Sequence, residues 1–137
     1  MQLWALSIAK VLAGSDVRWT SLALSAAEWP LNTGPNPEGK ANMQNTGWAL
    51  CPANGCFYAL SHTTSSNRLY KLTPPDGDDT SVLAGTWTLS TEAFVGGNAQ
   101  WSSTDYSRLQ WAPALNAFVW TGEDINGPVQ AIRPSGV

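Results

Sequence analysis

Few residues of this 137-residue chain combine the types and spacing that metal binding requires. Cys51 and Cys56 flank a four-residue turn, and His62 is the single histidine. Two thiols and one imidazole fall short of the four ligands of a structural zinc site. The acidic stretch 76–79 lacks the alternating carboxylates and the distal glutamate of a calcium loop, so we interpret it as an exposed turn. The sequence therefore predicts no metal site.

Signatures of catalysis are equally sparse. The sequence has no Gly-x-Ser-x-Gly, no phosphate-binding glycine loop and no paired histidines on a helix. Glu123 and Asp124 are adjacent, so on a strand their side chains would point to opposite faces. We expect no catalytic activity and no cofactor.

Aromatic and polar residues gather instead in the predicted connections 30–46 and 95–106, which are rich in Gly, Asn and Ser. Flat apolar rings beside hydrogen-bonding groups suit a carbohydrate or peptide ligand. The alternatives are that these aromatics cover the ends of strands and that the histidine lies solvated in its loop. The candidate binding residues are Asn45, His62, Trp101, Asp105, Tyr106 and Arg108.

Composition supports a folded domain and excludes some partners. The chain is 43% apolar with eight Trp and only 12% charged residues, which is ample for a packed core. A net charge of −3 disfavours a nucleic-acid partner. We expect no membrane span, because no segment is apolar over the roughly 18 to 20 residues required. Segment 1–15 lacks a basic start and contains Lys10, which favours a strand over a signal peptide and leaves the compartment open.

The chain repeats itself at a spacing of about sixty residues. Segment 50–58 aligns with 111–119 at an offset of 61 without a gap, and 68–74 aligns with 128–134 at an offset of 60. Such self-similarity is typical of repeat architectures, in which each unit buries its apolar face against its neighbours.

A partial copy opens the chain. Segment 3–6 resembles 69–72, and Val-Leu-Ala-Gly occurs both at 11–14 and at 82–85, followed by Trp19 and Trp87 respectively. We therefore divide the single domain into three units: 1–25 (partial), 46–91 and 107–137 (partial).

Short alternating apolar runs between Gly, Pro, Asn and Ser clusters predict strands throughout and no helix. The expected strands lie near Leu3 and at 18–24 in the first unit, at 47–51, 56–61, 68–73 and 86–91 in the second, and at 107–112, 117–121 and 128–133 in the third. In the turn at 52–55, Asn54 and Gly55 are expected to supply the positive φ angles.

The two cysteines align with Ala112 and Ala117, so small side chains are expected to face each other across both hairpins. Two alternatives remain open for Cys51 and Cys56. They form either a disulfide that closes a very short loop, or a pair of buried thiols, as a reducing compartment would favour.

Four antiparallel strands per unit, repeated, favour a β-propeller, with a β-sandwich as the alternative. The order of a Trp strand, a Gly- and Asn-rich loop, "CPANGCFYAL" or "APALNAFVWT", and "NRLYKLTPPDG" resembles kelch-type and galactose-oxidase-like β-propeller repeats. Residues that match this pattern are Trp19, Trp87, Arg108 and Tyr70.

The chain also departs from this family. Ser61-His62 and Thr121-Gly122 stand in place of the Gly-Gly doublet, Gly47 replaces the Arg, and Gln130 replaces the Tyr. The copper site of the oxidase members needs two histidines, so the resemblance does not imply that chemistry here.

The units begin and end on a third strand, which predicts one redundant and one missing strand. We expect an all-β, partial β-propeller of about two four-stranded blades that acts as a non-catalytic binding or structural module, recognising carbohydrate or protein through one loop face. Self-association would complete the propeller, with the strand around Trp19 joining the blade that ends at Arg133. The alternative is a truncated piece of a larger oxidase-like or phage virion-associated propeller, whose missing blades would be its partners.

Overall fold

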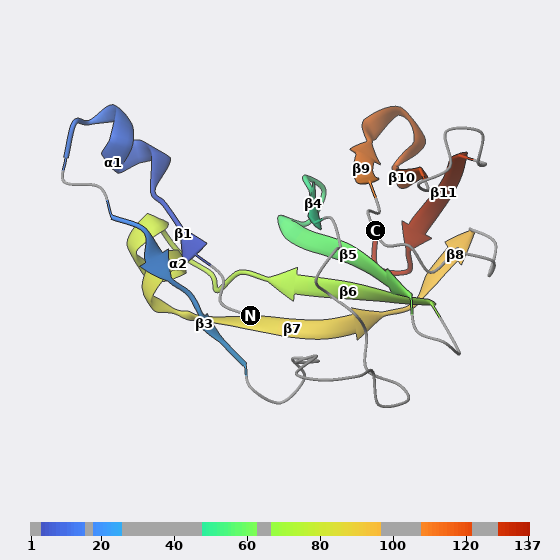
Figure 1. The fold of residues 1–137 in the computed structure, drawn as a ribbon, viewed down its shortest axis with the longest axis horizontal. Helices are drawn as coiled ribbons and strands as arrows, with labels where there is room; N and C mark the ends of the chain where they lie inside the picture. Colours follow the sequence, from blue (N-terminus) through green and yellow to red (C-terminus); the bar gives the residue numbers. More distant parts are fainter. Residues whose placement is uncertain (1–3, 16–17, 26–47, 63–66, 97–107, 122–128) are drawn as a thin grey trace.

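The structure, a computed structural model, describes residues 4–15, 18–25, 48–62, 67–96, 108–121 and 129–137. Its strands form a two-stranded sheet (β1-β2), a five-stranded sheet (β3-β7-β6-β5-β4) and a four-stranded sheet (β8-β11-β10-β9). The four-stranded sheet lies toward one end of the five-stranded sheet, and α1 lies beyond the other end (Figure 1). The prediction of an all-β chain is confirmed.

The elements follow the repeat. The N-terminal half-unit holds β1 (Trp4–Ala5), α1 (Ile8–Leu12) and β2 (Thr20–Ser21), followed by β3 (Ala23–Leu24). The middle unit holds β4 (Trp48–Cys51), β5 (Cys56–His62), β6 (Asn67–Thr73), α2 (Asp79–Ala84) and β7 (Thr86–Glu92), followed by β8 (Phe94–Gly96). The last unit holds β9 (Arg108–Ala112), the 3-10 turn η1 (Pro113–Leu115), β10 (Ala117–Thr121) and β11 (Val129–Pro134).

Strand pairing preserves the repeat residue by residue. Cys51 pairs with Cys56 in the middle unit, and Ala112 pairs with Ala117 in the last unit, 61 positions later. The next pairing follows the same rule: Phe57 faces Leu72, and Phe118 faces Ile132. Because a slip of one residue would turn every apolar side chain to the wrong face, the shared register gives both units the same two faces.

The hairpin turns of both units end on a left-handed residue. Gly55 has φ 69° and Asn116, its counterpart, has φ 46°. The expectation that Asn54 also has a positive φ is wrong: Asn116 is the non-glycine residue with a positive φ in the described part, and the Asn54 side chain instead stabilises the turn. The Asn54 Oδ1 accepts a hydrogen bond from the Cys56 backbone N–H at 3.1 Å, and the Asn54 Nδ2 donates to the Tyr58 hydroxyl at 2.9 Å.

Two short helices correct the prediction of a helix-free chain. Both follow a third strand, and both start at a side-chain cap: Ser7 accepts from the Lys10 N–H at 3.3 Å, and Asp78 accepts from the Ser81 N–H at 2.9 Å. With five and six residues, they are too short for a 3.6-residue period to emerge. Neither helix in the described part is long and apolar enough to cross a membrane.

The expected missing strand of the last unit is supplied from within the chain. The chain runs from β7 into β8, which pairs antiparallel with β11, with Ile132 opposite Gly96 (Figure 1). Gly96 has φ 89°, and a Cβ there would lie 2.5 Å from the Ala131 carbonyl oxygen, so only glycine fits. The half-unit likewise contributes a strand to the sheet of a neighbouring unit, since β3 joins the five-stranded sheet parallel to β7.

Two apolar cores result, one on each face of the five-stranded sheet. The first lies between the middle and last units and contains Tyr58, Leu69, Phe118 and Ile132. The second lies on the opposite face, where Leu22, Leu24 and Ala5 of the N-terminal strands, with Val82 and Leu83 of α2, pack on β6 and β7.

The left-handed turn gives a first prediction. Nothing lies within 4 Å of a Cβ added at Gly55, so Gly55→Ala changes only the backbone energy. We expect this substitution to lower the free energy of unfolding by about 1 kcal/mol, and Gly55→Asn to lower it less, since Asn116 occupies the equivalent position. Urea denaturation followed by tryptophan fluorescence measures both. Equal destabilisation by the two variants would contradict the equivalence of the turns.

Candidate functional site

Each unit has two faces, because side chains alternate along its strands. We call the two faces front and back. The front of the middle unit carries Trp48, Leu50, Phe57, Ala59 and Leu72, and its back carries Cys51, Cys56, Tyr58, Leu60 and Leu69. By the same register, the front of the last unit carries Leu109, Trp111, Phe118, Trp120 and Ile132, and its back carries Ala112, Ala117, Val119, Val129 and Ala131.

Within the chain, the back of the middle unit packs on the front of the last unit. The Tyr58 and Phe118 rings lie 5.1 Å apart between centroids, and Trp111 meets Phe118 edge-on at 5.0 Å. The closest strands across this interface are the first strands of the two units, β4 and β9. Both Tyr58 and Phe118 are completely buried. The units therefore associate head to tail, each using a different face.

A polar cluster holds this interface in place. The Tyr58 hydroxyl donates to Glu92 Oε2 at 3.0 Å, and the Lys71 ammonium lies 3.1 Å from the same oxygen. The backbone N–H of Gly136 donates to Glu92 Oε1 at 2.9 Å. Glu92 thus connects β5, β6 and the end of the chain, and its charge is balanced where it is largely buried.

Burial and hydrogen bonding shift the pKa values of this cluster. Burial alone would raise the pKa of Glu92, but the hydrogen bonds from Lys71, Gly136 and Tyr58 outweigh it and lower that pKa below 4.5. Burial raises the pKa of the Tyr58 hydroxyl, and the nearby carboxylate adds to this. Burial opposes the charge of Lys71, yet the hydrogen bond to Glu92 raises its pKa above 10.5.

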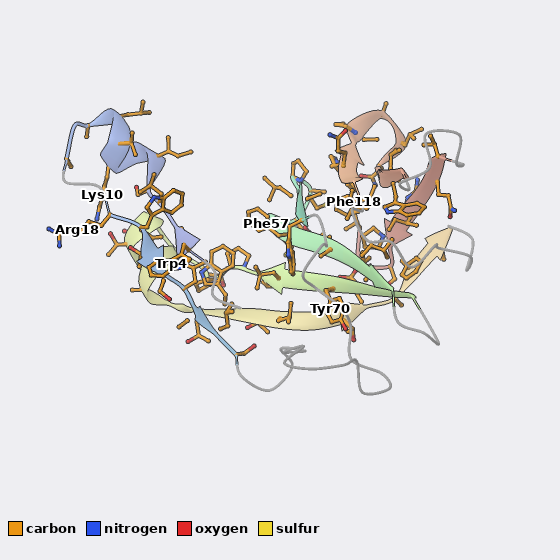
Figure 2. The ribbon with its side chains drawn as sticks, in the orientation of Figure 1. Trp4, Lys10, Arg18, Phe57, Tyr70 and Phe118 are labelled. Atoms are coloured by element: carbon orange, nitrogen blue, oxygen red, sulfur yellow. The ribbon has the colours of Figure 1, made fainter. Side chains whose placement is uncertain are left out.

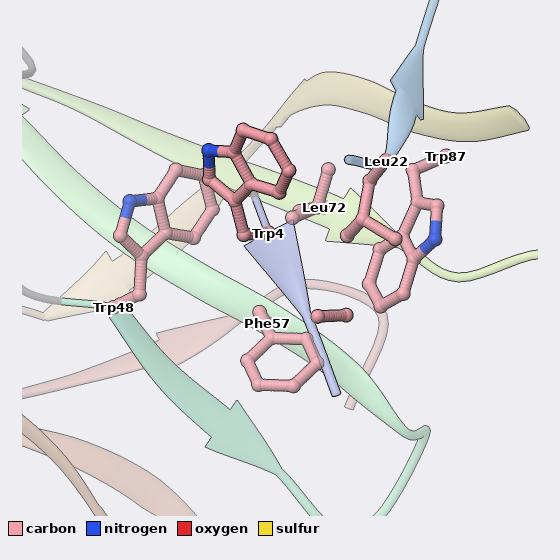
Figure 3. Close-up of a pocket in the computed structure, with 7 residues that line it drawn as sticks. Trp4, Leu22, Trp48, Phe57, Leu72 and Trp87 are labelled. Atoms are coloured by element: carbon pink, nitrogen blue, oxygen red, sulfur yellow. The ribbon is translucent and has the colours of Figure 1, made fainter. Parts of the chain in front are cut away.

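The front of the middle unit is open over an aromatic cavity of about 240 Å³. Three tryptophans and a phenylalanine dominate its wall, which consists of Trp4, Ala5, Leu22, Trp48, Phe57, Leu72 and Trp87. Trp4 and Trp48 lie on one side and Trp87 with Leu22 on the other (Figure 3). The Trp87 indole is fixed, since it donates to the Val82 carbonyl at 3.0 Å and lies 6.0 Å from the Phe57 ring. The wall is neutral, which suits an apolar occupant.

Large apolar side chains are exposed mainly toward the two ends of this stack of units. Trp4, Ile8, Val11, Leu12 and Trp19 of the half-unit are all at least 44% exposed. Figure 2 places Lys10 and Arg18 at this same end of the molecule, away from the sheet that carries Phe118. Exposed groups of this kind mark association surfaces more often than scattered single residues do.

Most of the binding residues predicted from the sequence are not placed by the structure. Asn45, Trp101, Asp105 and Tyr106 lie outside the described residues, so the loop-face site stays a prediction. His62 ends β5 opposite Asn67, one residue inside the strand rather than in the loop expected for it.

Arg108, the other predicted residue, begins β9 opposite Thr121. The described side chains instead bring together Trp4, Trp48 and Phe57, which sequence reasoning took as strand or core residues. The sequence feature that could have indicated this cavity is the alternation of Trp48 and Leu50, which places two large apolar side chains on one face of an edge strand.

Cys51 and Cys56 pair directly across the hairpin, and both are buried free thiols. Cys56 Sγ lies 3.5 Å from the Asn54 carbonyl oxygen and 3.7 Å from Thr73 Oγ1. Both thiols belong to the core between the two units. Among the described residues, no group of three or more His, Cys, Asp or Glu could hold a metal ion.

Comparisons with family models, curated proteins and solved structures find no match to this chain.

The Glu92 cluster gives a pH-dependent prediction. Because the folded-state pKa of Glu92 is lowered, its contribution to stability is present above pH 4.5 and is lost as the pH falls through the folded value. We expect Glu92→Gln to lower the free energy of unfolding by about 2 kcal/mol at neutral pH, with the difference from wild type shrinking below pH 4.5.

Urea denaturation across the acidic range, with the exposed Asp76→Asn as the matched control, measures this effect. A Glu92→Gln variant as stable as wild type at neutral pH would contradict the structural role of the cluster.

Proposed function

We propose that this chain is a non-catalytic binding and assembly module made of propeller-like blades, whose units associate face to face with further units of the same kind. One observation carries the proposal. The two units share one register and pack back to front, so the same two kinds of face are left at the ends of the stack.

The arrangement of strands supports propeller-like blades over a sandwich. In each unit, successive strands pair antiparallel with their neighbours in chain order, and the first strands of the two units lie closest to each other. Blades around a common axis are built this way. The sheets of a sandwich more often exchange strands through Greek-key connections, whereas in the described residues the strands that join another unit's sheet are the short β3 and β8.

The chemistry of the open face supports binding over catalysis. The cavity wall is aromatic and aliphatic. The polar groups of Tyr58, Lys71 and Glu92 are engaged with one another inside the fold. Partners of this module are then either copies of the chain or further blades of a parent protein.

Sedimentation velocity over a micromolar concentration series tests this proposal. We expect a discrete dimer, trimer or tetramer, because the apolar side chains that are exposed at each end of the described part are stabilised by covering them. A monomer at all concentrations, or a polydisperse aggregate, would contradict assembly through defined faces.

A further inference from the structure

The open aromatic cavity has a counterpart inside the chain that identifies its occupant. We propose that a second copy docks the back of its last unit onto the front of the middle unit, head to tail, over the cavity that includes Trp48 and Phe57. This inference rests on the proposed function and names the partner and the site.

The repeat shows what normally covers a front face. Phe57, Trp48 and Leu72 correspond to Phe118, Leu109 and Ile132 of the last unit. The three counterparts are fully buried beneath the back of the middle unit. In the middle unit, the equivalent side chains line the cavity; Leu72 is buried there at 5% exposure, whereas Trp48 and Phe57 are only partly buried.

The matching surface is also present on the chain. The back of the last unit is equivalent to the surface that covers Phe118, and Ala131, Val129 and Val95 on this face are exposed among the described residues. Leu69 on the back of the middle unit is 1% exposed, whereas its counterpart Val129 is 67% exposed. Val95 of β8 lies opposite Arg133 on this same face and is also 67% exposed.

Side-chain size is complementary across the proposed contact. The cavity presents large rings, and the back of the last unit presents small side chains, such as Val119 and Ala131, that leave room for them. Arg133 is the charged residue of this face in the described part of β11. Its guanidinium is already engaged, donating to the carbonyl oxygens of Leu115 at 2.8 Å and Asn116 at 3.0 Å.

The half-unit covers the front face only in part. Its strand β3 pairs with β7, and its Trp4, Ala5 and Leu22 line the cavity together with Trp48 of the first strand. On the first strand, Leu50 remains 46% exposed. Within the chain, the first strands β4 and β9 are the closest strands of the two units. By the same geometry, the second copy would place its own β9 and β10 against β4, the first strand of the middle unit.

Such a contact is heterologous, since the two copies use different faces. Repetition of the contact therefore produces a closed ring or an open chain of copies, depending on the rotation between them.

A complementation experiment tests the contact. Leu50→Glu places a charge on the front and Val129→Glu places one on the back, at positions exposed enough for the fold to tolerate them. We expect each variant alone to self-associate at least about tenfold more weakly than wild type. An equimolar mixture should form a heterodimer through the one intact front and the one intact back. Leu12→Glu, at an 83% exposed position on α1 and outside the paired strands of both units, is the matched control and should assemble like wild type.

Sedimentation velocity, with thermal melts to verify folding, separates the outcomes. If wild type assembles but neither variant weakens assembly, or if the mixture yields no heterodimer, the head-to-tail contact is wrong and the proposed function survives. If wild type is itself monomeric, both the contact and assembly by copies are overturned.

Discussion

The packing of Tyr58 against Phe118 joins the two repeated units into one fold. The rings lie 5.1 Å apart, and both are fully buried. The Tyr58 hydroxyl is held by Glu92 and Asn54, so the ring is fixed in position as well as buried. Tilted aromatic pairs add about 0.5–1.5 kcal/mol beyond the area they bury. The pair lies in a shared core with Leu69, Leu109 and Ile132, which together cover the back of the middle unit and the front of the last.

A contact between different faces has a consequence that a symmetric contact lacks. When a back covers a front, an open stack ends with a front at one end and a back at the other, and only a closed ring covers both. The N-terminal strands cover the open front in part, with Leu22 and Leu24 in the second core. The open back has no comparable cover in the described residues, and Val129 lies exposed on it. Stability in repeat proteins depends on such interfaces between neighbours as much as on each unit.

The sequence allowed the strands to be predicted because their apolar alternation is strong and the repeat has no gap between 50–58 and 111–119. The observed strands of the middle and last units differ from those expectations by a residue or two at their ends, whereas the single strand expected at 18–24 is divided into β2 and β3, which pair in different sheets. The helices were missed because five or six residues show no period, although the caps Ser7 and Asp78 were visible signals.

Other features depend on distant contacts that no local pattern encodes. The strand β8 has three residues, and its partner β11 lies more than thirty positions away. The cavity forms because Trp4, which belongs to the N-terminal half-unit, lines the same wall as Trp48 and Phe57 of the middle unit. The loop residues proposed for ligand binding, such as Trp101, lie outside the described residues. Their role in binding therefore remains a prediction from the sequence.

The head-to-tail packing of the units is the central claim, and a double-mutant cycle tests it most directly. The cycle combines Tyr58→Leu with Phe118→Leu and measures the free energies of unfolding by urea denaturation. If the rings touch, the coupling energy between the two substitutions is about 1 kcal/mol. A control cycle of Phe57→Leu with Phe118→Leu, whose side chains belong to different cores, should be additive within about 0.5 kcal/mol. Additive effects in the first cycle would contradict the packing of the middle unit on the last.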